Sequence, residues 1–403
     1  MRRTVKTNIY NLYLIKLSKW LMLIMPVVAL YYKENGLDDF DIYTLQAVYS
    51  LSVAFLEIPS GYMADVIGRR TSLIAGAILG TIGFGIYSLS SGFSHFLVAE
   101  IILGLGGSFI SGSDSALLYD SLAAESNQHR YLQYEGRITS LGNFAETIAA
   151  VCGGLIAAFI SYRGVYIGQM VIASLAIPAS LLLVEPKRET LKERPGLMQI
   201  LSICHQSIFI NRKLSATILL SSVIGTGTLC MAWTSQVYFV YNGLDEVSIT
   251  PLWVLLNLTV ALVAAVAHKT RRLLGYRNSL LLVIFYIPAG YILLGLLPLI
   301  AGIVSLILFY AIRGYATPVL KDLTNNYCGS EIRATVLSIR SLIIRISFSI
   351  LGPLIGILSE RFSFEYALIL IGCVLVCASL LTGLFLFTAA PETTRPPKDL
   401  KIH

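Results

Sequence analysis

Long apolar runs alternate with short polar segments along the whole chain. A helix rises about 1.5 Å per residue, so about 20 apolar residues cross the hydrocarbon core of a bilayer. Runs of this length are predicted at 9–33, 40–62, 71–91, 95–122, 134–160, 164–184, 214–241, 248–268, 278–297, 299–323, 333–358 and 364–388. The pattern predicts an all-α membrane protein with twelve transmembrane helices.

The longest polar interval, 185–213, separates six predicted helices from the next six. It predicts an N-terminal six-helix bundle over 1–184, a cytoplasmic central loop over 185–213, a C-terminal six-helix bundle over 214–390 and a cytoplasmic tail over 391–403. Short motifs repeat at one spacing between these halves. ENGLDD at 34–39 matches YNGLDE at 241–246, and Gly68-Arg69-Arg70 aligns with Gly275-Tyr276-Arg277. Duplicated halves of this kind are typical of transporters that bind substrate near the bilayer midplane.

Composition and charge agree with a membrane location. The chain has 403 residues, of which 56% are hydrophobic and 13% charged, whereas soluble domains average about 25% charged residues. Lys and Arg concentrate in alternate loops, and the loops between them carry only Lys33, Arg163 and Arg361. Because cytoplasmic loops hold the excess of basic residues, both termini are predicted to be cytoplasmic. The net charge of +7 is then a topology signal, and no nucleic-acid partner is expected.

The polar turn GYMADVIGRR lies between the second and third predicted helices. It resembles the signature loop of the major facilitator superfamily, with glycine, acid, glycine and two bases at the family's spacing. With the repeated halves, the resemblance covers essentially the whole chain and is closest in kind to bacterial drug and metabolite carriers. It implies two pseudo-symmetric six-helix bundles that transport by alternating access.

The resemblance also implies a latch on the cytoplasmic side. In this reading Asp65 faces the start of the eleventh helix, while Arg69 or Arg70 pairs with Asp120. The alternative is that the two arginines serve only as topology signals. The second copy of the loop carries Arg272 where the acid would fall, so we expect an asymmetric latch. The predicted gate comprises Gly61, Asp65, Gly68, Arg69, Arg70, Asp120 and Arg137.

Seven ionisable residues within the predicted spans are singled out as candidates: Lys16, Lys19, Glu57, Asp114, Glu146, Arg313 and Arg345. Each costs about 3 kcal/mol or more near the midplane, so each is a candidate for function. A structural alternative is simple pairing, of Lys16 or Lys19 with Asp114 and of Arg313 or Arg345 with Glu146. In the functional interpretation Asp114 and Glu146 carry protons, and Glu57 either joins them or supports the latch.

The bases are assigned to the substrate cavity, together with two aromatic residues. The cavity set is Lys16, Lys19, Arg313, Arg345, Trp233 and Tyr315. More bases than acids in the membrane favour a substrate with an anionic or polar group.

The fifth predicted helix bears on the direction of transport. Exporters of the family usually end this helix in G-P-x-x-G-G, whereas here Ala149-Ala150 replaces Gly-Pro and Gly153-Gly154 remains. This departure from the motif counts against proton-coupled export. We nevertheless favour a secondary active transporter of a small organic solute, proton-coupled and directed outward. One alternative is uptake of a small anionic or polar metabolite, and another is a non-transporting receptor or lipid-handling protein on the same fold.

Enzymatic signatures are missing from the sequence. It contains no H-E-x-x-H, no G-x-S-x-G and no G-x-x-x-x-G-K-[ST], so neither hydrolysis nor ATP-driven pumping is expected. No cofactor or metal is expected either. The expected partners are a small-molecule substrate, protons and membrane lipids, for a monomer in a bacterial plasma membrane.

Overall fold

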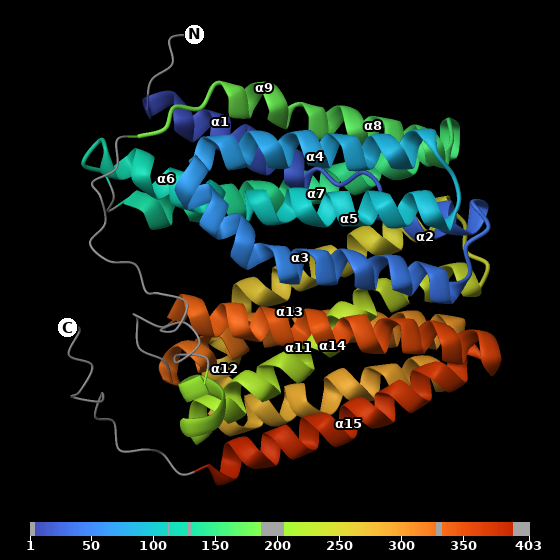
Figure 1. The fold of residues 1–403 in the computed structure, drawn as a ribbon. Helices are drawn as coiled ribbons and strands as arrows, with labels where there is room; N and C mark the ends of the chain where they lie inside the picture. Colours follow the sequence, from blue (N-terminus) through green and yellow to red (C-terminus); the bar gives the residue numbers. More distant parts are fainter. Residues whose placement is uncertain (1–4, 112, 128–129, 187–204, 328–332, 390–403) are drawn as a thin grey trace. The chain divides into compact units, whose positions relative to one another are not determined.

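The computed structural model describes residues 5–111, 113–127, 130–186, 205–327 and 333–389, which are helical almost throughout and contain no strand (Figure 1). The first half contains α1 (Val5–Trp20), α2 (Val28–Glu34), α3 (Asp39–Ile67), α4 (Arg69–Leu89), α5 (Phe93–Ile110), α6 (Ser113–Ala123), α7 (Tyr131–Phe159), α8 (Tyr162–Ser174) and α9 (Ala176–Leu181). A short π-helix (Gln206–Ile210) precedes α11 (Arg212–Tyr241), α12 (Glu246–Leu296), α13 (Leu299–Tyr327), α14 (Arg333–Arg361) and α15 (Phe364–Thr388).

Among the described residues, nine helical segments are long and apolar enough to cross a membrane. The predicted all-α membrane fold is therefore confirmed. The α1–α2 pair, α3 and α7 fall outside this set, so the count of twelve spans stays a prediction. Within α12, Gly275 has φ 75° and ψ 169°, which breaks the helix and separates two of the predicted spans.

The first predicted span is not one continuous helix, and the prediction of 9–33 is wrong on this point. The chain leaves helical geometry after Trp20 and resumes it at Val28. Pro26 lacks an N–H and disfavours helical geometry in the residue before it, which accounts for a break there. We call residues 21–27 the helix-1 break.

Side chains from other helices form hydrogen bonds with backbone groups of the helix-1 break. The Leu23 N–H donates to Oε1 of Gln169 at 2.7 Å, and the Met25 carbonyl accepts from Nε2 of Gln236 at 2.8 Å. A Cβ at Gly153 would collide with the Leu23 carbonyl oxygen, so only glycine lets α7 approach this closely. Buried backbone groups need such partners, so these contacts stabilise the break as part of the fold.

Contacts divide the described chain into two compact units. Unit 1 contains the described residues up to 186 together with Trp233–Leu258 and Gly352–Glu360, and unit 2 contains the remainder. The predicted domain boundaries at 184 and 214 stay a prediction.

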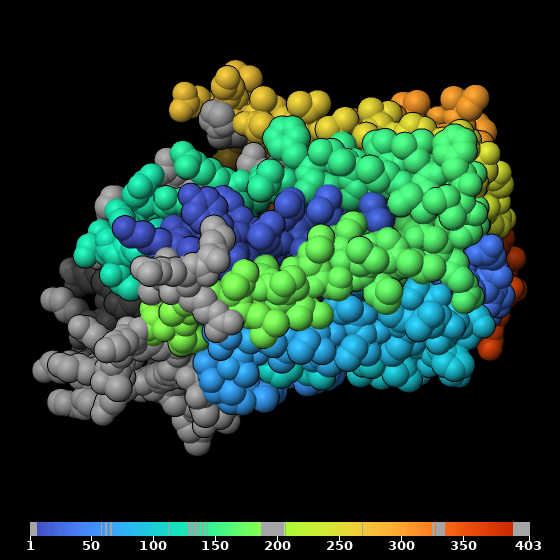
Figure 2. Space-filling model, turned by 90° about the horizontal axis from the view of Figure 1, so that it is seen from above, coloured from blue at the N-terminus to red at the C-terminus, as the bar shows by residue number. Residues whose placement is uncertain are grey.

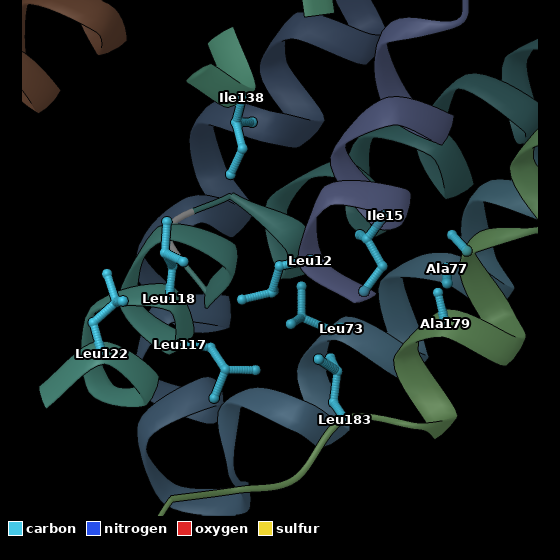
Figure 3. Packing of buried hydrophobic residues seen from close by; sticks show 11 residues of the cluster. Leu12, Ile15, Leu73, Ala77, Leu117, Leu118, Leu122, Ile138, Ala179 and Leu183 are labelled. Atoms are coloured by element: carbon cyan, nitrogen blue, oxygen red, sulfur yellow. The ribbon is translucent and has the colours of Figure 1, made fainter. Parts of the chain in front are cut away.

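Unit 1 has a core at one end, built by α1, α4, α6, α7 and α9. In Figure 3, Leu12 and Ile15 of α1 lie among side chains of the other helices. Figure 2 shows α7, α1, α9 and α4 side by side on one face of this unit, with α8 continuing the line of α9. The core holds the segment before the helix-1 break against helices that are distant in sequence.

Unit 2 is held by close approaches at small residues. A Cβ at Gly290 would overlap the Phe309 ring, and one at Gly225 would overlap the Ile344 side chain. The Tyr291 hydroxyl donates to the Gly227 carbonyl at 2.5 Å. Small residues are the usual means by which membrane helices pack closely.

The repeated NGLD motif forms the same turn twice. Gly36 and Gly243 have φ 79° and 74°, a region that favours glycine. Asn35 and Asn242 each donate to a carbonyl four residues earlier at 2.8 Å. Asp38 accepts from the Asp41 N–H at 2.7 Å, and Asp245 from the Ser248 N–H at 2.9 Å, so each aspartate caps the following helix. The sequence repeat is thus a repeat of structure.

Candidate functional site

Unit 1 contains a cavity of about 290 Å³. Its wall comes from α1, the helix-1 break, α2, α3, α4, α5, α8, α9 and one residue of α11. The lining is mostly apolar and aromatic, with few polar side chains, as in small-molecule sites generally. The main polar lining residues are Ser18, Lys19, Gln46, Glu100 and Gln169.

Glu100, on α5, is the centre of a buried hydrogen-bond network. Its Oε1 accepts from the Tyr87 hydroxyl at 2.6 Å, the Tyr32 hydroxyl at 3.1 Å and Nε2 of Gln46 at 3.1 Å. The two hydroxyls are also 2.8 Å apart, and Gln46 donates to Tyr32 at 3.1 Å. The network joins α2, α3, α4 and α5 at a side chain that is 5% exposed.

Aromatic rings surround this network. The centroids of Tyr31 and Tyr166 lie 4.1 Å apart, and those of Tyr87 and Phe96 lie 4.6 Å apart. The Tyr31 hydroxyl donates to the Tyr87 carbonyl at 2.6 Å. These contacts fix α2, the short helix after the break, against α4, α5 and α8.

Glu100 is absent from the seven intramembrane charges predicted above, although it lies within the predicted span 95–122. The sequence feature that could have marked Glu100 is a single acid, between Ala99 and Ile101, in an otherwise apolar run. Its partners Tyr32, Tyr87 and Gln46 come from other helices, and nothing in the local sequence marks them.

Two of the predicted charges pair inside unit 1. Lys16 Nζ lies 3.6 Å from Oδ2 of Asp114, and the two side chains are 7% and 11% exposed. Lys16 also donates to the Ser115 hydroxyl at 3.2 Å, and the Ser115 N–H donates to Asp114 Oδ1 at 2.6 Å. Of the two pairings considered for Asp114, the structure therefore has the one with Lys16. Glu57 on α3 and Glu146 on α7 are both half-buried.

The residues predicted to line the cavity separate into groups. Lys19 and Trp233 line the cavity of unit 1. Lys16 does not, because it is directed to Asp114 and Ser115. Arg313, Arg345 and Tyr315 belong to unit 2.

The three unit 2 residues have different surroundings. The Arg313 guanidinium lies 5.2 Å from the centroid of the Tyr310 ring. Nε of Arg345 is buried and has no hydrogen-bond partner among the described residues. Tyr315 is 2% exposed and donates to the Ser279 hydroxyl at 2.5 Å, as a packing residue would.

The GYMADVIGRR turn has a defined geometry around Gly68. This glycine, with φ 110°, separates α3 from α4. Arg69 forms an ion pair with Asp120 and donates to the Ala116 carbonyl at 2.7 Å. The base that pairs with Asp120 is thus Arg69, while Arg70 donates to the Leu181 carbonyl at 3.0 Å.

Glu185 is a further member of this turn, although nothing in its local sequence marks it. Its carboxylate accepts from the backbone N–H of Arg69 at 3.1 Å and of Arg70 at 2.8 Å. It caps the N-terminus of α4, where unpaired N–H groups favour an anion.

The remaining predicted gate residues lie on α3 and α7. Gly61 and Asp65 lie in the last turns of α3, and the Asp65 side chain is outside what the structure describes. Arg137 is exposed on α7. Their part in the latch stays a prediction.

The second copy of the turn keeps the ion pair but changes the position of the base. Arg271 pairs with Asp322, the counterpart of Asp120. Its guanidinium lies 5.7 Å from the centroid of Tyr276, which occupies the position of Arg69. The base thus precedes the glycine in this copy and follows it in the first.

Comparison with known proteins identifies the family. Residues 18–328 match the family model described as the Major Facilitator Superfamily. The chain belongs to the major facilitator superfamily. Members of this family are transporters, and this member is an integral multi-pass membrane protein.

Similar sequences come from bacteria and archaea. This chain is 24% identical over 237 residues to the quinolone resistance protein NorA of Staphylococcus aureus (strain MRSA252). That match covers 58% of this chain and 59% of NorA, so the chain spans less than two thirds of this relative. It is 21% identical to an uncharacterized MFS-type transporter of Methanocaldococcus jannaschii, over 83% of this chain and 88% of the relative.

Solved structures agree on the fold. The nucleoside transporter NupG aligns with a TM-score of 0.74 at 12% identity, covering 95% of this chain and 100% of NupG. A D-xylose-proton symporter aligns with a TM-score of 0.73 at 16% identity, covering 97% of this chain and 98% of the symporter. At these identities the likeness establishes the major facilitator fold.

Proposed function

We propose that this superfamily member is a secondary active transporter that exports a small organic solute in exchange for protons, by alternating access. The observation that carries the proposal is the cavity of unit 1. Its wall is largely apolar and aromatic, and the helix-1 break and the ionisable Glu100 and Lys19 form part of it. Broken helices and few fixed polar groups are typical of transporter binding sites.

Proton coupling is assigned to Asp114 and Glu146, with Glu57 as a third candidate. The Lys16–Asp114 pair supports this assignment, because protonation of the acid would release the base from its partner. Such a pair has two states that a proton can select.

Outward direction is supported by likeness to NorA, whose name records quinolone resistance. Uptake of an anionic solute is the second candidate. The partly unsatisfied Arg345 and the cavity-lining Lys19 favour it, since both are bases available to an anion. A receptor or lipid-handling protein would bind a ligand without moving it across the membrane.

The Gly68 turn is proposed to act as the cytoplasmic gate. Arg69, Asp120 and Glu185 join α4 to α6 and to the segment after α9. In this proposal Asp65 belongs to the same latch, which is closed in one conformation and open in the other.

A transport assay tests the proposal. Purified protein in proteoliposomes is given a panel of aromatic cations, anions and neutral solutes under an imposed pH gradient. We expect solute to move against its gradient and proton flux to accompany it. If solute is bound but never moves, a receptor or lipid-handling role replaces transport.

The proposed role of Lys16 and Asp114 in proton coupling is tested with a variant that leaves no unpaired buried charge. The double variant K16Q/D114N removes both partners, which avoids the cost of an unpaired ion. We expect it to lose dependence on the pH gradient, while Glu34→Gln, an exposed charge loss on α2, retains it. Unchanged pH dependence in the double variant would show that this pair is only structural.

A further inference from the structure

The carboxyl group of Glu100 has no basic partner among the described residues. Lys16 is engaged by Asp114, and Lys33 lies 2.6 Å from Asp39. Arg163 is directed to the carbonyls of Ser88 and Ser90, each at 3.4 Å. A buried carboxylate held only by hydroxyl and amide donors remains electrostatically attractive to a cation.

The two oxygens of Glu100 differ. Oε1 accepts from Tyr32, Tyr87 and Gln46, which fixes the carboxyl in one orientation. Oε2 accepts no hydrogen bond from the described residues, and Glu100 forms part of the cavity wall. One oxygen is thus anchored, and the other is available to a ligand.

The aromatic part of the wall suits an aromatic cation. Tyr32, Tyr49, Phe84, Tyr87, Tyr166 and Trp233 line the cavity. Aromatic faces attract cations and stack on planar ligands.

We propose that Glu100 is the counter-charge of a binding site for aromatic organic monocations. The cationic nitrogen lies against Oε2, and the planar body lies among the cavity-lining rings. This inference rests on the proposed function and deepens it, because it names the substrate class of the same cavity. It reverses the expectation of an anionic substrate that the excess of intramembrane bases suggested.

Protons compete with such a ligand, because a protonated carboxyl offers no negative charge. The titratable groups around Glu100 are Tyr32 on α2, Tyr87 on α4 and Tyr166 on α8, with Lys19 of α1 in the same cavity. Gln46 on α3 carries no charge. Affinity for the cation should therefore fall as the medium is acidified.

Binding of N-methylacridinium to the full chain in lipid nanodiscs provides the test. Uncharged acridine, at mildly alkaline pH, is the matched neutral probe, and fluorescence titration measures both. In Glu100→Gln, affinity for the cation should fall by about 30-fold or more, as expected when one partner of a buried charge pair is lost. Affinity for acridine should not change, which also reports that the cavity is folded.

Two further variants complete the test. Glu100→Asp should retain part of the cation affinity and its dependence on pH, whereas Glu34→Gln, an exposed charge loss on α2, should match the wild-type protein. Absence of cation binding to the wild-type protein, or equal affinity in Glu100→Gln and wild type, would overturn the inference. Because the titration measures binding alone, a failure of proton-driven transport leaves its result standing.

Discussion

Gln169 supplies, from a distant helix, a hydrogen bond that the helix-1 break removes from the backbone. Its side chain is 0% exposed, and its Oε1 accepts the Leu23 N–H. The sequence could not predict this contact, because the two residues are separated by 146 positions and the apolar run continues through Pro26. The pairing of Lys16 with Asp114 could be predicted, because opposite charges in apolar spans have few other means of neutralisation.

Substitution of Gln169 tests whether the break depends on this contact. Gln169→Ala leaves a buried N–H without a partner and should lower the free energy of unfolding by about 1–3 kcal/mol. Ser174→Ala on the same helix removes only a local bond to the Val171 carbonyl and serves as the control. Equal stability of the two variants in thermal unfolding would show that Leu23 finds another acceptor.

Gly153 offers a steric test of the same region. Gly153→Ala places a methyl group against the Leu23 carbonyl and should destabilise the protein by about 1–3 kcal/mol. Gly80→Ala, at a helical site with nothing within 4 Å of a Cβ, should be neutral or slightly stabilising. A well-folded Gly153→Ala protein with unchanged melting temperature would contradict the close approach of α7.

At the scale of elements, hydropathy predicted most helices, since a membrane span must bury its own backbone and expose apolar side chains. The NGLD repeat predicted matching connections, and both copies form the same turn and helix cap. The capping of α4 by Glu185 was not foreseen, because the acid follows the last helix of the bundle and the capped N–H groups open the third span.

Removal of the Glu185 carboxylate tests its role as a cap. Glu185→Ala should lower the free energy of unfolding by about 1 kcal/mol, the usual cost of losing an N-terminal cap. Glu185→Gln, which keeps one acceptor oxygen, should recover part of the loss. Hydrogen exchange at the first turn of α4 is the measurement, and protection equal to wild type in Glu185→Ala would refute the cap.

The second NGLD turn predicts a dependence on pH. Hydrogen bonds from the Ser248 hydroxyl and backbone N–H lower the pKa of Asp245, which lies outside the membrane spans. A carboxyl with a lower folded-state pKa stabilises the fold above its unfolded pKa, and this contribution is lost as the pH falls through the folded value. The melting temperature of Asp245→Ala should therefore lie below that of the wild-type protein at neutral pH, and this difference should shrink in acid. Asp245→Asn should remove the pH dependence and retain the cap.

At the scale of the whole molecule, duplication explains both the likeness and the difference of the halves. Each pairs an arginine beside a glycine turn with an aspartate, Asp120 or Asp322. In unit 1 the turn occurs together with a cavity whose wall includes the buried Glu100. The family signature predicted the fold, whereas the cavity depends on side chains from several helices and could not be predicted from local sequence.

Exchange of solute for protons can be measured with the outward solute gradient as the only driving force. Proteoliposomes without a pH gradient are loaded with a transported solute, and a pH-sensitive dye records the lumen after dilution. If protons enter as solute leaves, the lumen becomes acidic, and a protonophore abolishes this change. Solute efflux with no change in lumenal pH would contradict the exchange.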